Sequence, residues 1–363
     1  MIKPVAIFFC LAVVVCSAQS SSNQNDVITL IDERLPVTPG EFYVANVLDA
    51  RTDSSPVASL ATGTKGLPFK TRAVDLKGGT LAAVKKFINN CVPRNAELLP
   101  LIIKLKKISV KEQAKEGGMV EGRIEVSFSF NLDKGEDDMI YLAKYNGNAV
   151  YNRDAVRAGD IEPTLRRLMI NGLLYINNWM NTQSGANIKL ARGVKVNFAD
   201  YAETPEGDSI YYSVKRPLTW ADFQSKVPAS NYEAEVFPTL GYDEHTEIIN
   251  GIINLHIAVK TCLPKSASWV KAYSKNDYSL NHEQRHFDIA KIASEHFKQT
   301  IKGRHLTTAN YDGPINEEYL DAYREMTNLQ KQYDEETVHG THTLIQQQWN
   351  DRIDKELKVL GIK

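Results

Sequence analysis

Apolar and polar positions in the first half of the chain follow a few regular patterns. Residues 122–132 alternate between apolar and polar side chains, which predicts a half-buried strand. The apolar segment 101–110 predicts another strand, and two adjacent glycines between the segments favour a hairpin. Apolar residues at helical spacing predict helices over 80–91 and 162–180. These elements predict a small α+β domain with helices on one face of a sheet.

The second half of the chain is mainly helical in pattern. Strand-like residues occupy 210–214 and 252–259. Three long helices are then expected over about 278–302, 314–339 and 341–361. Glycine or proline stands near the ends of these segments, where each residue favours a helix boundary.

A polar, turn-rich stretch at residues 200–208 separates the two regions and predicts a domain boundary. We therefore expect an N-terminal α+β accessory domain over 30–201, which serves as a binding or positioning module. A second domain is expected over 208–363. All eight histidines lie in this second region, from His245 to His342, so the chemistry is expected there.

The N-terminal residues have the pattern of an export signal. Lys3 is followed by an apolar run of about a dozen residues, too short for a bilayer span of about 20 residues. Residues 1–18 are therefore predicted to be a signal peptide, and the Ser/Asn/Gln-rich residues 19–29 a flexible tether. A lipid anchor on Cys16 is the less favoured alternative, because Val15 is bulky. We expect a periplasmic or secreted protein.

Charge and cysteine content narrow the class of protein further. The formal net charge is -1 with both signs interspersed, so no nucleic-acid partner is expected. No other stretch is apolar enough to cross a membrane. After signal cleavage only Cys91 and Cys262 remain. Export permits a disulfide between them, but they fall in separate expected domains, which favours two free thiols.

The strongest chemical signal is a His-Glu-Gln-Arg-His run on the helix expected over 278–302. His282 and His286 share one helix face about 6 Å apart along the axis, so both imidazoles can bind one zinc ion. Glu283 is rotated by about 100° and lies beside the metal, where a general base for a zinc-activated water belongs. The alternative is two ordinary histidines on a partly buried helix.

A catalytic zinc usually has three protein ligands, so a third must come from elsewhere. His296 lies about 15 Å further along the same helix and cannot reach the metal. His305 lies further still. His245 and His256 precede the motif, in an expected loop and strand.

Residues 333–342 offer the remaining candidates for the third ligand. They lie where one helix ends and another begins, so a side chain can be directed back at the first helix. His339 is the first choice, Glu336 the second and Glu335 the third. The acidic run 334–336 is otherwise typical of a solvated helix face.

Several separated motifs resemble one known family. They are, in chain order, Leu-Thr-Trp-Ala-Asp-Phe at 218–223, Ser-Trp-Val at 268–270, Asn-His-Glu-Gln-Arg-His-Phe-Asp-Ile-Ala at 281–290, Tyr-Asp-x-Glu-Thr-x-His-Gly at 333–340 and Gln-Trp at 348–349. Over about residues 211–353 the chain resembles the bacterial proteins described as predicted secreted zinc-dependent proteases, formerly a domain of unknown function.

The resemblance implies a zincin-like α+β metallopeptidase domain with a metal-binding helix. It supports His282 and His286 as zinc ligands and Glu283 as the base, and it singles out His339 as the third ligand. Arg285 departs from the pattern, because a smaller residue is expected there. The resemblance does not identify a substrate.

The expected function is that of an exported zinc-dependent metallohydrolase, a peptidase acting on a protein or peptide. One alternative is a zinc-stabilised envelope scaffold that binds a partner through its N-terminal domain. Glu283 argues against a scaffold, because a structural site needs no base. A zinc amidase acting on cell-wall material is the other alternative. Two weaker site candidates are Asp288, as an acceptor for a ligating imidazole, and Tyr333, as an oxyanion donor.

Overall fold

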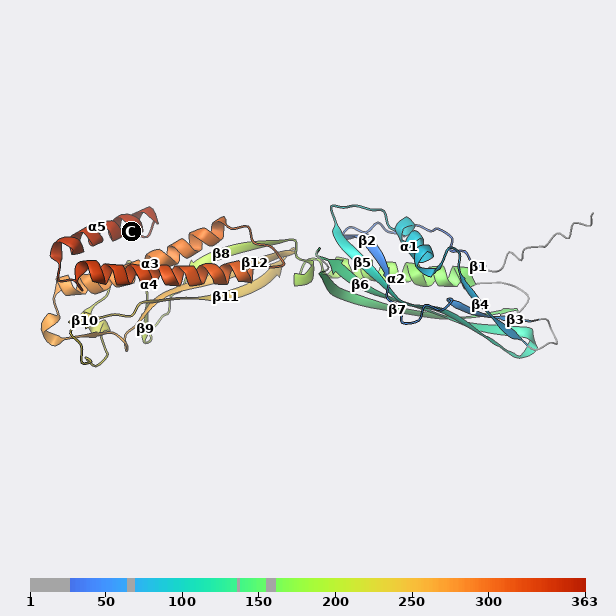
Figure 1. Cartoon of the computed structure of the whole chain (residues 1–363), viewed down its shortest axis with the longest axis horizontal. Helices are drawn as coiled ribbons and strands as arrows, with labels where there is room; N and C mark the ends of the chain where they lie inside the picture. Colours follow the sequence, from blue (N-terminus) through green and yellow to red (C-terminus); the bar gives the residue numbers. More distant parts are fainter. Residues whose placement is uncertain (1–26, 64–68, 136–137, 155–160) are drawn as a thin grey trace, which may run out of the picture. The chain divides into compact units, whose positions relative to one another are not determined.

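The computed structural model describes residues 27–63, 69–135, 138–154 and 161–363 (Figure 1). The expected signal peptide lies outside the described residues, as does most of the expected tether. The chain divides into two compact units, Met1–Asn181 and Thr182–Lys363. Each unit combines a sheet with helices, so the predicted α+β class is confirmed.

Unit 1 is built on a seven-stranded sheet in the order β1-β4-β3-β5-β6-β7, with β2 paired to β5. Its strands are β1 (Val27–Ile28), β2 (Phe42–Asp49), β3 (Ala58–Thr62), β4 (Lys70–Leu76), β5 (Leu99–Ala114), β6 (Met119–Asp133) and β7 (Met139–Asp154). The expected hairpin is the antiparallel β5–β6 pair. Gly117 and Gly118 in its connection have φ angles of 74° and 82°, which glycine adopts without strain.

Two helices, α1 (Thr80–Cys91) and α2 (Ile161–Gln183), pack on this sheet close to their predicted positions. The contact of α2 is close at Gly172, where an added Cβ would lie 2.9 Å from the Phe128 ring and 3.0 Å from the Tyr145 ring. The apolar face predicted for residues 122–132 therefore lies under α2.

Unit 2 contains a four-stranded sheet with β12 (Ile252–Pro264) at its centre. Around β12 lie β8 (Gly193–Asp200), β9 (Ser209–Tyr211) and β11 (Thr239–Ile249), and a separate pair joins β10 (Ala234–Glu235) to β13 (Trp269–Val270). Because β8 pairs with β12 along its whole length, it belongs to unit 2. The boundary expected at 200–208 therefore falls too late in the chain. The half-buried pattern of β8 does not reveal its distant partner.

Three long helices belong to unit 2, and they match the three predicted ones. They are α3 (Asp277–Gly303), α4 (Asp312–Thr337) and α5 (Thr343–Val359) (Figure 1). One apolar core joins β11 and β12 to α3 and α4, and it includes Leu255, Ile257, Ala290, Phe297 and Met326. Another joins α3, α4 and α5, and it includes Ile289, Tyr333, Trp349 and Ile353.

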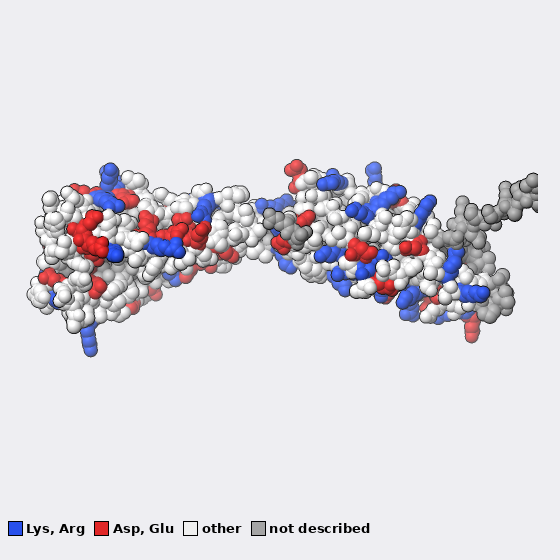
Figure 2. Space-filling view, in the orientation of Figure 1, with Lys and Arg blue, Asp and Glu red and all other residues white. Residues whose placement is uncertain are grey.

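The surface charges, the helices and the cysteines can each be compared with the expectations from sequence. On the face drawn in Figure 2, acidic and basic side chains occur on both units. Among the described residues, no helix combines the length and the apolar character needed to cross a membrane. Cys91 and Cys262 lie in different units, and both are free thiols.

Candidate metal centre

The His-Glu-Gln-Arg-His run lies in the N-terminal half of α3. The helix begins after Asn276, whose side chain accepts a hydrogen bond of 2.9 Å from the Ser279 amide. Further along the helix, Phe297 is buried in the core and fixes the rotation of α3. His282 and His286 consequently project together into the interior, with exposed fractions of 6% and 7%.

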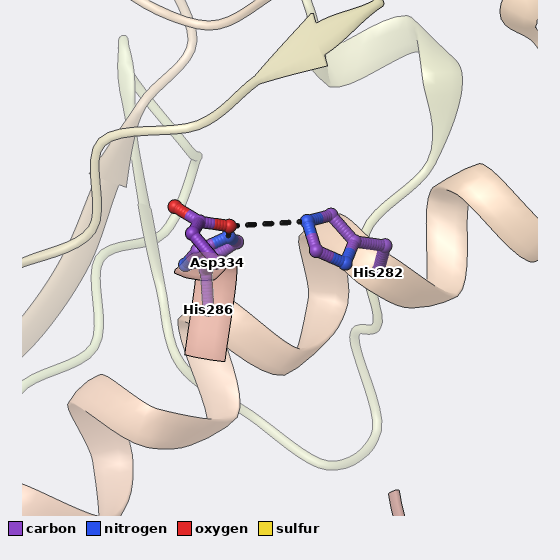
Figure 3. Close-up of side chains that lie close together, drawn as sticks. All are labelled: His282, His286 and Asp334. Atoms are coloured by element: carbon purple, nitrogen blue, oxygen red, sulfur yellow. Dashed lines mark hydrogen bonds and ion pairs between the residues drawn. The ribbon is translucent and has the colours of Figure 1, made fainter. Parts of the chain in front are cut away.

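Asp334, near the end of α4, completes a compact group with these two imidazoles (Figure 3). Its Oδ1 lies 3.3 Å from His282 Nε2 and 3.0 Å from His286 Nε2. Ligand atoms around a tetrahedral zinc ion with bonds of about 2.0–2.1 Å lie about 3.3 Å apart. Two nitrogens and a carboxylate oxygen at this spacing are a donor set that suits zinc.

The charges within the group favour ionised Asp334. Burial alone would raise the pKa of this carboxyl, but the imidazoles of His282 and His286 beside it hold that pKa well below its usual range. Burial also disfavours the charged form of His286, and the hydrogen bond and charge of Asp334 outweigh this and raise the pKa of that imidazole. Asp334 is thus available as an anionic ligand.

The connection between α4 and α5 approaches the metal motif closely at one point. Val338, His339 and Gly340 have φ angles of 52°, 50° and 79°, and this left-handed run ends α4. A Cβ added to Gly340 would lie 3.1 Å from His282 Cγ. The Gly340 carbonyl also accepts a 2.6 Å hydrogen bond from Tyr278 Oη. Position 340 therefore requires glycine for both its backbone conformation and its contact with His282.

Glu283 lies beside the histidines with only 5% of its surface exposed. Within the described residues its carboxylate forms no hydrogen bond or ion pair. Burial raises its pKa, which His286 and His282 partly oppose. The nearby carboxylates of Asp334 and Glu235 raise it further. A buried carboxylate without a partner is costly, so Glu283 is suited to meet a group that the protein itself does not supply.

One ring nitrogen of His286 is a buried atom that lacks a hydrogen bond. His286 presents Nε2 to Asp334, while its Nδ1 is buried without a hydrogen bond among the described residues. The side chain of Gln330 lies near this imidazole and contributes to raising its pKa. His282 differs, because its Nδ1 lies 2.8 Å from Oε1 of Gln346, a residue of α5. The two imidazoles are therefore held by different surroundings.

His339, the predicted third ligand, lies on the exposed side of Asp334. Its Nδ1 is 3.5 Å from Asp334 Oδ1, and its side chain is 42% exposed. The His339 ring also contacts the Tyr232 ring, with a distance of 4.0 Å between centroids. The compact group whose ligand atoms all lie within 4.8 Å of one another includes Asp334 in place of His339. His339 as a ligand stays a prediction.

The two acidic alternatives for the third ligand are engaged elsewhere. Glu336 accepts hydrogen bonds of 2.8 Å from both Trp349 Nε1 and Gln332 Nε2. Glu335 is exposed and lies 3.8 Å from Lys331 Nζ. Neither carboxylate belongs to the group around His282.

Asp288, a weaker candidate for the site, is surrounded by hydrogen-bond donors other than the histidines. Its carboxylate is fully buried and accepts hydrogen bonds from Arg285, Tyr212 and Gln284 at 2.9–3.0 Å. No imidazole of the described chain donates to it, so the idea that Asp288 orients a metal ligand is wrong. The carboxylate instead neutralises buried Arg285.

Tyr333 is fully buried and packs against both imidazoles, with ring centroids 4.7 Å from His282 and 5.0 Å from His286. Its hydroxyl donates to the His282 carbonyl at 3.3 Å and accepts from Gln346 Nε2 at 2.5 Å. The hydroxyl is therefore used inside the protein, which contradicts a role for Tyr333 as an oxyanion donor.

Sequence reasoning missed Asp334 and Gln346 as site residues. Asp334 lies between fully buried Tyr333 and Thr337 on α4, so its position faces inward in contrast to the rest of the acidic run. Gln346 is 1% exposed and shares a helical stripe with Trp349 and Ile353. A polar residue on an apolar stripe was the available signal for Gln346.

Comparison with known proteins identifies no family for this chain. No family model matches it, and no curated protein matches it. A crystal structure of a DUF330 family protein from Xanthomonas campestris matches with a TM-score of 0.29 and 9% identity. That match covers 43% of this chain and 99% of the other.

A second solved structure, of an uncharacterized protein, matches with a TM-score of 0.24 and 10% identity, over 42% of this chain and 98% of the other. Both likenesses are too weak to support an argument about function. Nothing in these comparisons supports a zinc protease family.

Proposed function

We propose that unit 2 is a zincin-like zinc-dependent hydrolase domain and that the protein is an exported peptidase. The observation that carries the proposal is Glu283, a buried carboxylate without a partner beside two histidines and an aspartate. A purely structural metal site has no use for such a group.

The residues of the cluster fit a zinc ion. His282, His286 and Asp334 would hold it through two nitrogens and one oxygen, the atom types that zinc prefers. A zinc ion bound there polarises a carbonyl group and lowers the pKa of a water molecule. Three protein ligands leave one position for the substrate or for water, which is the arrangement of catalytic zinc sites.

Glu283 would act as the proton carrier in peptide hydrolysis. Its carboxylate takes a proton from the attacking water while the water oxygen bonds to the substrate carbonyl carbon. The same proton is then delivered to the amide nitrogen as the C–N bond breaks, which yields a carboxylic acid and an amine. Burial strengthens Glu283 as a base because it raises the pKa of its carboxyl.

A scaffold function remains as a second candidate because of His339. Its Nδ1 is only 3.5 Å from Asp334 Oδ1, so a small shift would allow it to join the ligands. Four protein ligands would close the coordination shell, as in structural zinc sites. The two candidates therefore differ in whether His339 is needed for zinc binding.

The substrate that we propose is a protein or peptide of the cell envelope or its surroundings. Unit 1 would position that substrate or bind an envelope partner. Export rests on the sequence pattern of the first 18 residues. An amide in cell-wall material is hydrolysed by the same chemistry and belongs in the substrate screen.

The test is a comparison of the wild-type chain with Glu283→Gln. Glutamine preserves the shape of the side chain and leaves the zinc ligands in place, but it cannot accept the proton. We expect unchanged zinc content by elemental analysis and a loss of about 10²–10⁴-fold in the hydrolysis rate on a peptide library or on cell-wall fragments.

Two results would count against the enzyme. One is equal hydrolysis by Glu283→Gln and wild type on a substrate that the wild type cleaves. The other is a lack of any hydrolysis by zinc-loaded wild type together with loss of zinc from His339→Ala, which would favour the scaffold.

A further inference from the structure

We propose that Arg285, acting through Asn350 and Gln346, fixes the protonation of His282 so that its Nε2 presents a lone pair to the metal. The metal-binding part of this inference rests on the proposed zinc site. We call the hydrogen bonds from Arg285 through Asn350 and Gln346 to His282 the hydrogen-bond relay. Its effect on the protonation of His282 can be measured without metal. The relay gives a role to Arg285, the residue that departs from the expected pattern.

The relay starts from a group that can only donate. Arg285 carries a guanidinium, which has no acceptor atom. Its Nη1 and Nη2 donate to Asp354 at 2.6 and 3.0 Å, so the group is held in one orientation. Its Nε donates to Asn350 Oδ1 at 3.1 Å. The side-chain oxygen of Asn350, and not its nitrogen, must therefore face Arg285.

The orientation of Asn350 then determines that of Gln346. Gln346 Nε2 donates to Asn350 Oδ1 at 3.0 Å and to Tyr333 Oη at 2.5 Å. A reversed Gln346 amide would place its oxygen against the Asn350 oxygen, which no proton could bridge. Gln346 Oε1 is thereby directed at His282 Nδ1, 2.8 Å away.

An acceptor at this position decides which nitrogen of His282 carries the proton. Nδ1 must donate to Gln346 Oε1, so in the neutral imidazole Nε2 has the lone pair. That Nε2 faces Asp334 Oδ1 at 3.3 Å, where the zinc ion would lie. Tyr333 Oη donates to the His282 carbonyl at 3.3 Å and closes the network. The relay thus prepares His282 as a ligand before metal arrives.

Hydrogen bonds to the far nitrogen of a ligating histidine affect metal affinity by about 10–100-fold when they are removed. The relay applies to His282 alone, because Nδ1 of His286 has no partner in the described chain. Asn350, Gln346 and Arg285 are positioning residues, since none of them contacts the expected metal position directly.

The experiment compares Gln346→Met, Gln346→Glu and a matched control, Gln347→Met. Methionine keeps the length of the side chain but provides no strong acceptor, whereas glutamate keeps an acceptor for Nδ1. Gln347 makes a comparable bond of 2.8 Å to Asp351 on the exposed face of α5. Circular dichroism verifies that each full-length variant is folded.

Two measurements are made on each variant. Zinc affinity is measured by competition with a chelator, and the spectrum of the cobalt-substituted protein reports the ligand geometry. Independently, ¹⁵N NMR of histidine-labelled, metal-free protein at alkaline pH reports which nitrogen of His282 is protonated.

We expect protonation at Nδ1 in wild type, and a shift towards Nε2 in Gln346→Met with about 10–100-fold weaker zinc binding. Gln346→Glu should retain the Nδ1 proton, because its carboxylate accepts from Nδ1 although it has no donor for Asn350, and Gln347→Met should match wild type. Wild-type His282 protonated at Nε2 would overturn the relay, as would folded Gln346→Met with unchanged affinity and protonation. Protonation at Nδ1 in a wild type that binds no zinc would instead support the relay and refute the proposed zinc site.

Discussion

Each unit buries a cluster of charged side chains, and the two clusters differ in whether their polar atoms are paired. In unit 1 the Glu112 carboxylate, whose side chain is 0% exposed, accepts from Tyr151 Oη, from Arg153 and from the Ala61 amide at 2.6–2.8 Å. In unit 2, Glu283 has no partner in the described chain, and His286 Nδ1 has none either.

This difference separates a structural cluster from a site for a ligand. A buried charge is tolerated when hydrogen bonds surround it, as they do for Glu112. The cluster around Glu283 departs from this pattern, because the Glu283 carboxylate has no hydrogen-bond partner among the described residues and His286 Nδ1 is a buried atom without one. Unit 1 therefore uses its charges to hold strands together, whereas the charges of unit 2 are arranged for a partner outside the chain.

The largest effect, complete loss of folding, is expected when unit 2 is produced as a fragment that begins at the wrong residue. A fragment of residues 182–363 should fold and bind zinc alone, because the metal-binding cluster and the three apolar cores around it lie in unit 2. A fragment of residues 208–363 lacks β8, and with it the pairing to β12 and the contact between Phe198 and Phe297. It should fail to fold, as measured by circular dichroism. A shorter fragment as stable as the longer one would contradict the assignment of β8 to unit 2.

The cluster of unit 1 can be opened by substitution. Arg153→Met leaves Glu112 buried without its cation, and we expect a loss of about 3–5 kcal/mol in the free energy of unfolding of unit 1. The double variant with Glu112→Gln should lose less than the single variant, since no charge remains unpaired. Denaturant titration measures both values, and zinc content should stay at the wild-type level. A loss of zinc would show that the clusters are not independent.

The ligands of unit 2 can be distinguished by two alanine variants. Asp334→Ala removes the atom that lies closest to both imidazoles, so zinc affinity should fall by at least about 100-fold, or about 2.7 kcal/mol. His339→Ala should change affinity by less than about tenfold, because its side chain lies on the exposed side. Calorimetric titration of metal-free protein gives both constants. The reverse order would restore His339 as the third ligand.

The smallest effect is expected at the close contact between the α4–α5 connection and His282. Gly340→Ala places a methyl group 3.1 Å from the imidazole at a φ of 79°, so unit 2 should lose about 1–2 kcal/mol of stability. Gly361→Ala is a suitable control, because its φ is 73° but no atom lies within 4 Å of the added group. A greater loss of zinc affinity in Gly340→Ala than in the control would link this contact to the position of His282.

Helical periodicity predicted α1 to α5 within a few residues, because each helix carries its own pattern of apolar positions. The patterns do not predict β2, β3, β4, β7 or β8. β7 pairs with its chain neighbour β6, and β3 with its neighbour β4, but the partners of β2 and β8 lie far along the chain, as in the pairing of β8 with Ile252–Val259. The domain boundary was misplaced for the same reason.

The site residues also differ in whether the local sequence is enough to predict them. His282, Glu283 and His286 could be found because helix geometry alone brings them together. Asp334 and Gln346 come from α4 and α5, and only packing against α3 directs them to the imidazoles. His339 and Asp334 are five residues apart in the chain and their side chains approach to 3.5 Å, so sequence reasoning selected the correct region but not the residue nearest the imidazoles.

The hydrogen-bond relay has a consequence for inheritance. Arg285, Asn350 and Gln346 determine one another's orientation. A substitution at one position therefore changes which side chains are favourable at the other two. A related protein with a small residue at position 285 lacks the charged donor to the oxygen of Asn350 and keeps only the amide donors Asn281 Nδ2 and Gln346 Nε2. We expect such lineages to carry different side chains at 346 and 350 as well. Positions 285, 346 and 350 should therefore vary together among relatives, although position 285 on α3 lies more than sixty residues before the other two on α5.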